Sequence, residues 1–166
     1  MFKWIIIVFA LVSFTVNPDM QQAKIIKFNK FQSLEREANS DRNDTVYVFN
    51  FFATWCKPCV HELPGFEKLS AAYKGQKVKF TFISLDFAKD FQSKLIPFIK
   101  QKNIQSQVYL LDEPDYNSWI DKVDKSWGGS IPATIVINSS HHFYKFYETE
   151  MAREDLENII KPLVTQ

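Results

Sequence analysis

Two kinds of hydrophobic pattern alternate along the chain after residue 20. Runs of β-branched and aromatic residues, continuous or alternating with polar ones, predict β-strands. These runs lie at residues 23–28, 45–53, 78–86, 107–112, 133–138 and 142–148. Apolar residues that recur every three or four positions predict helices between the strands. The helical patterns lie at residues 31–38, 56–73, 87–102 and 152–164, and residues 114–127 are predicted as a helical or looped insertion.

The order of these elements predicts the fold class. The run TVYVFNFFA at residues 45–53 is nearly continuous, as expected for a central strand that is covered on both faces. The last two strands are separated only by the short polar turn SSH, which predicts an antiparallel hairpin. Strands that alternate with helices and end in a hairpin and a helix predict an α/β domain over residues 21–166, with a central mixed sheet flanked by helices on both faces.

The first 16 residues, MFKWIIIVFALVSFTV, carry one cation, Lys3, and then an apolar run that ends before Asn17. This is the pattern of a secretory leader, and we predict that residues 1–20 are a signal peptide. The alternative is an uncleaved membrane anchor, for which roughly 20 apolar residues would be usual. In either case the protein is expected to be exported to the periplasm or the outer face of the cell envelope. If the leader is not cleaved, the N-terminus would tether the protein to the membrane.

Composition and charge narrow the function further. Hydrophobic residues make up 46% of the chain, including 16 Phe, which is ample for a packed core and unlike a disordered protein. The net charge is only +1 and the cations are scattered, so the chain has no basic stripe that would track a phosphate backbone. We therefore expect the protein not to bind nucleic acid. We also expect it to be a monomer.

Cys56 and Cys59 are the only cysteines in the chain, which excludes a scaffold held by several disulfides. A bridge between them would close a very small loop and stabilise the fold little. A metal site formed with His61 is the other alternative, but structural zinc sites use four ligands, often from a second CxxC motif. We expect His61 to face solvent and the pair to need no metal or other cofactor.

The position of the pair predicts a redox role with different tasks for its two members. Cys56 lies at the start of a predicted helix, where free N–H groups and the helix dipole stabilise a thiolate and lower the pKa of the thiol. Lys57 adds a positive charge beside it. Cys59 lies one turn further along the helix and should be more buried. We therefore predict that Cys56 attacks a substrate disulfide and that Cys59 resolves the mixed disulfide.

Two polar residues lie near the pair, and one of them, Glu62, is a candidate for proton transfer. Glu62 lies three positions after Cys59 on the same helix, and a buried carboxylate there could exchange a proton with the Cys59 thiol. The alternative is an ordinary exposed helix glutamate. Asn50 interrupts the apolar run before Cys56, where it either only hydrogen-bonds locally or belongs to the site.

Two segments resemble the thioredoxin superfamily: VFNFFATWCKPCVHELPGFEKL at residues 48–69 and GGSIPATIVIN at residues 128–138. The resemblance implies a thioredoxin-like fold with an insertion before the cis-proline loop. It also implies a cis bond between Ile131 and Pro132, and a groove in which the backbone of Ile131 binds an extended substrate. The further residues expected to bind substrate are Trp55, Lys57 and Pro58.

Within the superfamily the chain resembles the exported TlpA/ResA-like branch. The resemblance rests on the leader, Asn50, the sequence ELP at residues 62–64 and the long segment at residues 87–127. It implies a reductase of protein disulfides that is recharged by a membrane electron donor, with Glu62 as an active-site glutamate. Ala133, after the cis-proline, and Thr149, before the last helix, depart from the common pattern.

The sequence thus predicts an exported thiol-disulfide oxidoreductase, acting as a reductase. Lys57 and the helix dipole favour a more oxidising pair, whereas the resemblance favours reduction. A peroxidase is disfavoured because TWCKPC is not a lone-cysteine motif. The alternative from another class is a thioredoxin-like binding module that holds a metal ion or an extended partner without redox turnover.

Overall fold

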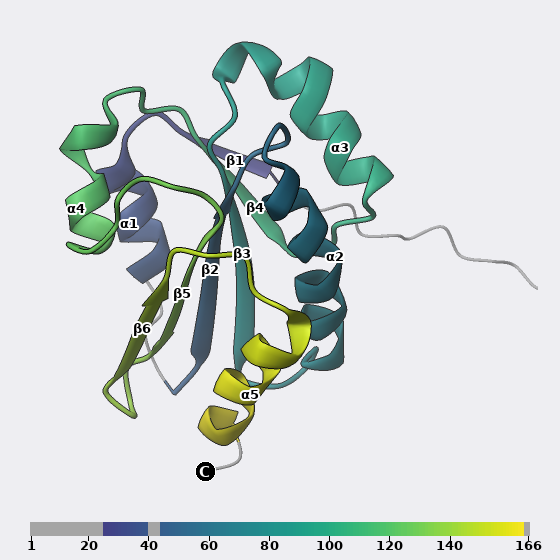
Figure 1. Ribbon diagram of the computed structural model, residues 1–166, viewed down its shortest axis with the longest axis vertical. Coiled ribbons are helices and arrows are strands. Elements are labelled where there is room, and N and C mark those ends of the chain that lie inside the picture. Colours follow the sequence, from purple (N-terminus) through teal and green to yellow (C-terminus); the bar gives the residue numbers. More distant parts are fainter. Residues whose placement is uncertain (1–24, 40–43, 165–166) are drawn as a thin grey trace, which may run out of the picture.

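The computed structural model describes residues 25–39 and 44–164. The predicted signal peptide at residues 1–20 lies outside the described residues. Six strands form one sheet in the order β1-β4-β3-β2-β5-β6. The strands are β1 (Ile25–Phe28), β2 (Val46–Phe52), β3 (Val78–Ser84), β4 (Gln107–Leu111), β5 (Ala133–Asn138) and β6 (Phe143–Tyr147). The first four are parallel to one another, and β5 and β6 are antiparallel to their neighbours. The predicted mixed sheet and terminal hairpin are confirmed (Figure 1).

Strand β2 lies inside the sheet, between β3 and β5. All seven of its residues are buried, as the continuous apolar run predicts. Successive side chains of a strand point to opposite faces, so Val48 and Phe52 pack into one core, while Phe49 and Phe51 pack into the other. Asn50 shares the first face and lies opposite Thr134 of β5, which places a polar side chain inside an apolar layer.

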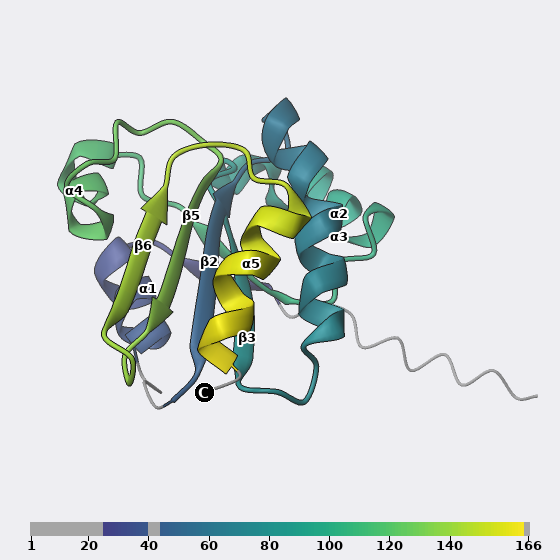
Figure 2. The same cartoon turned by 60° about the horizontal axis from the view of Figure 1, so that its bottom comes forward.

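Helices cover both faces of the sheet, as Figures 1 and 2 show together. The helices are α1 (Phe31–Asn39), α2 (Lys57–Ala72), α3 (Ile96–Gln101), α4 (Ile120–Val123) and α5 (Arg153–Val164). Apolar residues of α2, α3 and α5 pack into the core that contains the cysteines, and those of α1 and α4 pack on the opposite face. None of the helices in the described part of the chain is long and apolar enough to cross a membrane.

The segment at residues 87–127 contains two different kinds of structure around β4. Its first part is helical, with a 3₁₀ turn (Ala88–Asp90), a π-helical stretch (Phe91–Leu95) and α3. Its last part is mostly loop, with a 3₁₀ turn (Tyr116–Ser118) and α4. Trp119 anchors this last part. Its buried ring stacks on Phe31 at 5.5 Å between centroids and meets Trp127 edge-on at 5.6 Å.

A carboxylate from this same segment caps α1. The Phe31 N–H donates to Oε2 of Glu113 at 2.6 Å, and Nζ of Lys30 lies 2.9 Å from Oε1. These partners hold the pKa of Glu113 below its usual range. We expect Glu113→Gln to lower the free energy of unfolding by about 1–2 kcal/mol at pH 7, as measured by urea denaturation.

The difference in free energy of unfolding between Glu113→Gln and wild type should disappear at low pH. The lowered pKa of Glu113 stabilises the fold above the pKa of the unfolded chain, and the contribution is lost as pH falls through the folded pKa. Glu35→Gln, on the same helix, is the control for a change of charge. Equal stability of Glu113→Gln and wild type at pH 7 would contradict the capping role.

Candidate functional site

The N-terminus of α2 positions the two cysteines. Cys56 is the N-cap residue, with the extended backbone angles φ −85° and ψ 105° that such residues adopt. Its sulfur accepts the backbone N–H of Cys59 at 3.3 Å, so a sulfur atom takes the place of a capping hydroxyl or carboxylate. Pro58 lies in the first turn, where its missing N–H costs nothing, and Pro64 lies inside the helix.

Cys56 and Cys59 form a disulfide with an S–S distance of 2.03 Å and a Cα–Cα distance of 5.3 Å. Cys59 is completely buried, whereas Cys56 retains 6% of its surface. The predicted difference in burial between the two cysteines is therefore confirmed. Of the two cysteines, only Cys56 retains any exposed surface.

The cis-proline loop lies against the disulfide. The Ile131–Pro132 peptide bond is cis, as the resemblance implies, and the carbonyl oxygen of Ile131 is 3.6 Å from the Cys56 sulfur. Pro132 is buried and Ile131 is half-buried. A loop 75 positions away in the sequence thus forms one wall beside the reactive sulfur.

The other predicted substrate-binding residues lie at the surface next to the pair. Trp55 is 59% exposed, and Lys57 and Pro58 are exposed in the first turn of α2. An apolar ring, a cation and a proline are therefore exposed within two positions of Cys56 in the chain. Trp55 is one of only a few large hydrophobic side chains that the described residues leave exposed.

Glu62 is buried on the inner side of α2, with 4% of its surface exposed. Asn50 Nδ2 donates to its Oε1 at 2.7 Å, and the backbone N–H of Met151 donates to its Oε2 at 2.9 Å. Asn50 also donates to Oγ1 of Thr134 at 3.0 Å. The alternative of an exposed helix glutamate is therefore wrong, and Asn50 belongs to the site through Glu62.

The environment of Glu62 raises the pKa of its carboxyl group toward neutral pH. Burial penalises the charged carboxylate and raises the pKa of Glu62 to about 7, although the hydrogen bonds from Met151 and Asn50 oppose the shift. The nearby charge of Glu150 adds to the increase. A carboxyl group with this pKa both accepts and releases a proton at physiological pH.

Sequence reasoning missed Asp86, which supports the segment before the cysteines. This carboxylate is buried, with 2% of its surface exposed. It accepts the Thr54 N–H at 3.1 and 3.2 Å, the Thr54 hydroxyl at 2.6 Å and the Ser84 hydroxyl at 2.8 Å. An acidic residue two positions after the buried strand β3 was the available signal for this role.

The histidines do not join the cysteines. His61 is exposed, as predicted, and its Nδ1 contacts the carboxylate of Glu150. His141 and His142 lie in the turn between β5 and β6. Within residues 25–39 and 44–164 no three His, Cys, Asp or Glu side chains gather in a group that could hold a metal ion.

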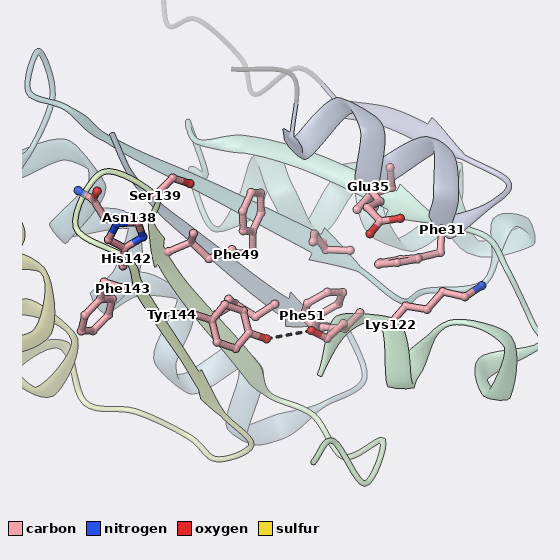
Figure 3. Close-up of a pocket in the computed structure, with 15 residues that line it drawn as sticks. Phe31, Glu35, Phe49, Phe51, Lys122, Asn138, Ser139, His142, Phe143 and Tyr144 are labelled. Atoms are coloured by element: carbon pink, nitrogen blue, oxygen red, sulfur yellow. Dashed lines mark hydrogen bonds between the residues drawn. The ribbon is translucent and has the colours of Figure 1, made fainter. Parts of the chain in front are cut away.

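A pocket lies on the other face of the sheet (Figure 3). Its volume is about 440 Å³. Phe49 and Phe51 belong to its floor, and the Tyr144 hydroxyl at its rim donates to the carbonyl of Val123 at 2.9 Å. Because these residues pack into the core opposite the cysteines, this pocket is separate from the disulfide.

Comparison with known proteins identifies relatives for most of the chain. The model of the AhpC/TSA family matches residues 18–144. The thioredoxin-like protein YneN of Bacillus subtilis is 23% identical over 128 residues, which cover 77% of this chain and 71% of YneN. The thiol-disulfide oxidoreductase ResA of a Bacillus cereus strain is 29% identical over 118 residues, which cover 69% of this chain and 61% of ResA.

The fold also has close neighbours among solved structures. A thioredoxin-related protein from Neisseria meningitidis serogroup B superposes with a TM-score of 0.64 at 21% identity, covering 77% of this chain and 91% of that one. The mixed six-stranded sheet with helices on both faces is therefore a thioredoxin-like fold. The chain spans less than two thirds of the length of the Bacillus cereus ResA.

Proposed function

The chain belongs to the AhpC/TSA family, and from that premise we propose that it is an enzyme that exchanges thiols and disulfides through Cys56 and Cys59. The observation that carries the proposal is the closed disulfide at the N-terminus of α2, beside the cis-proline loop. One relative is itself named a thiol-disulfide oxidoreductase. The resemblance to the thioredoxin superfamily and its TlpA/ResA-like branch is confirmed.

The first step uses the more exposed sulfur. In the reduced protein the Cys56 thiolate attacks one sulfur of a substrate disulfide, the substrate S–S bond breaks, and a mixed disulfide forms. The displaced substrate thiolate takes a proton from solvent. The N–H of Cys59, which already contacts the Cys56 sulfur, and the helix dipole stabilise the attacking thiolate.

The second step uses the buried sulfur. The Cys59 thiol transfers its proton to the Glu62 carboxylate, and the resulting thiolate attacks the Cys56 sulfur of the mixed disulfide. The Cys56–Cys59 disulfide forms, and the second substrate thiolate leaves and is protonated. Two electrons thus pass from the protein dithiol to the substrate. Glu62 suits the proton transfer because its pKa of about 7 lies near the working pH.

The surroundings of Cys56 favour a protein as the substrate. Trp55, Lys57 and Pro58 would contact its side chains, and Ile131, next to Pro132, would pair with an extended substrate backbone, as in strand addition. The leader at residues 1–20 supports export, and a membrane electron donor would then return the oxidised pair to the dithiol. We propose no metal or other cofactor, because the cysteine pair itself carries the electrons.

The reduction potential of the pair tests the direction of exchange. We expect titration of the purified protein in dithiothreitol buffers to give a potential below roughly −260 mV, the lower end of the extracted glutathione range. A dithiol with such a potential donates electrons to disulfides of higher potential, such as strained or exposed ones. The fluorescence of Trp55, next to Cys56 in the chain, is a convenient signal for the oxidised fraction.

A potential near roughly −120 mV, as in the oxidant DsbA, would instead make the protein a disulfide donor. If the pair does not cycle between dithiol and disulfide at any buffer ratio, the protein is not a redox enzyme. The alternative would then be a binding module that holds a metal ion or an extended partner. Zinc stoichiometry of the reduced protein, measured with and without thiol blocking, separates those two occupants.

A further inference from the structure

A carboxylate at the end of the sheet holds the segment that leads into the cis-proline loop. Oε2 of Glu148 accepts the backbone N–H of Gly128 at 2.9 Å, and its Oε1 accepts the N–H of Ser130 at 2.7 Å. Glu148 directly follows strand β6, and the loop precedes β5. The carboxylate therefore connects the ends of two neighbouring strands across 18 to 20 positions of sequence.

The loop that Glu148 holds has few other constraints on its shape. Gly128, Gly129 and Ser130 are all exposed, and Gly129 has a φ of +90°, which glycine adopts without strain. A second constraint comes from Trp127, whose indole N–H donates to the Ser130 carbonyl at 2.8 Å. Two adjacent glycines leave the backbone of such a loop many conformations unless hydrogen bonds select one.

The contact between Glu148 and the loop is close and charged. A Cβ at position 128 would lie 3.3 Å from Oε1 of Glu148, so glycine permits the short approach. The backbone N–H groups lower the pKa of Glu148, and the side chain is a carboxylate at neutral pH. Hydrogen bonds to an ionised acceptor are about twice as strong as neutral ones.

The next residue along this loop is Ile131, whose carbonyl lies 3.6 Å from the Cys56 sulfur. We propose that Glu148 is a positioning residue that holds residues 128–130 so that the backbone of Ile131 is ready to bind an extended polypeptide beside Cys56. The inference rests on the proposed exchange with polypeptide disulfides and adds to it the residue that positions the substrate-binding loop. A small disulfide without peptide groups has no backbone to pair with Ile131 and does not need Glu148 to position the loop.

The test compares two disulfides in stopped-flow oxidation of the reduced full-length protein, followed by tryptophan fluorescence. One probe is a synthetic peptide with an internal disulfide, and the other is hydroxyethyl disulfide. Glu148→Gln keeps the size of the side chain but loses the charge and one acceptor. We expect the half-saturating peptide concentration to rise about tenfold, with an unchanged rate for hydroxyethyl disulfide. Glu148→Ala should give a larger increase, since both bonds are lost.

Glu67→Gln is the matched control. Glu67 also accepts two backbone N–H groups, from Gln105 at 2.8 Å and Ser106 at 3.1 Å. It lies about three turns along α2 from Cys56. This variant shows the general effect of losing a carboxylate that holds a loop, and it should react with both probes as wild type does.

The possible results distinguish a failure of the positioning role of Glu148 from a failure of the proposed thiol-disulfide exchange. If Glu148→Gln and Glu67→Gln react alike with the peptide, Glu148 has no positioning role. An equal loss of rate with both probes in Glu148→Gln would indicate a damaged disulfide site and would also overturn the inference. If the reduced wild-type protein oxidises with neither probe, the proposed function itself is wrong.

Discussion

Replacement of Cys59 by serine is expected to make the protein accumulate as a mixed disulfide with its substrate through Cys56. Cys56 is the cysteine that retains exposed surface, and its sulfur caps α2, so it can still attack. Cys59 is completely buried, and without its sulfur nothing inside the protein can break the new bond. Replacement of Cys56 by serine should abolish exchange altogether, because it removes the only accessible nucleophile.

Mass spectrometry under non-reducing conditions measures this result, with the peptide disulfide as the partner. The adduct of Cys59→Ser should account for most of the protein and disappear on addition of dithiothreitol. The double serine variant is the control for non-covalent capture. Adduct formation by Cys56→Ser alone would reverse the assigned roles.

Local sequence patterns were enough to predict most of the framework. The apolar run at residues 45–53 predicted β2 as a central strand because complete burial requires apolar residues on both faces. The helical spacing after Cys56 and the turn SSH predicted α2 and the final hairpin for similar local reasons. Residues 114–127 gave no periodic pattern, and they form mostly loop because Trp119, rather than a helix face, anchors them.

The contacts that support the site could not be predicted from local sequence patterns, because they join segments that are far apart in the chain. Met151 lies 89 positions from Glu62, and Asp86 lies 32 positions from Thr54. Each contact depends on how two elements meet at the same end of the sheet. Glu148 gave no signal in the sequence, since a glutamate after an exposed strand is ordinary until the loop it holds is known.

Glu62 shows how the fold makes a proton carrier from an ordinary side chain. Helical spacing alone places it near Cys59, but its pKa depends on burial beneath the segment that carries Met151. Asn50, from the middle of β2, fixes the orientation of the carboxylate. The three residues come from β2, α2 and the segment before α5, so the folded structure, rather than the CxxC motif, creates the group that can take up the Cys59 proton.

Replacement of Glu62 by glutamine is expected to slow resolution of the mixed disulfide by roughly 100-fold or more, while the first attack by Cys56 continues at the wild-type rate. Glutamine keeps a hydrogen-bonding side chain of the same size but cannot accept a proton. Rapid chemical quenching separates the two steps, and Glu67→Gln is the control. Equal resolution rates in Glu62→Gln and wild type would remove Glu62 from the mechanism.

The pH dependence distinguishes proton transfer from a merely structural role. The rate of wild-type resolution should increase with pH around a midpoint near 7, where Glu62 becomes a carboxylate, and Glu62→Gln should lack this midpoint.

The free energy of unfolding should change with pH in the opposite direction. Because the folded pKa of about 7 lies above the unfolded value of 4.5, ionisation favours the unfolded chain between these values. The oxidised wild-type protein should therefore lose up to about 3 kcal/mol as pH rises from 4.5 to 7, and Glu62→Gln should lose less. The same burial that makes Glu62 a proton carrier at neutral pH thus costs stability there, and measurement of both profiles on one pair of proteins tests whether a single group is responsible.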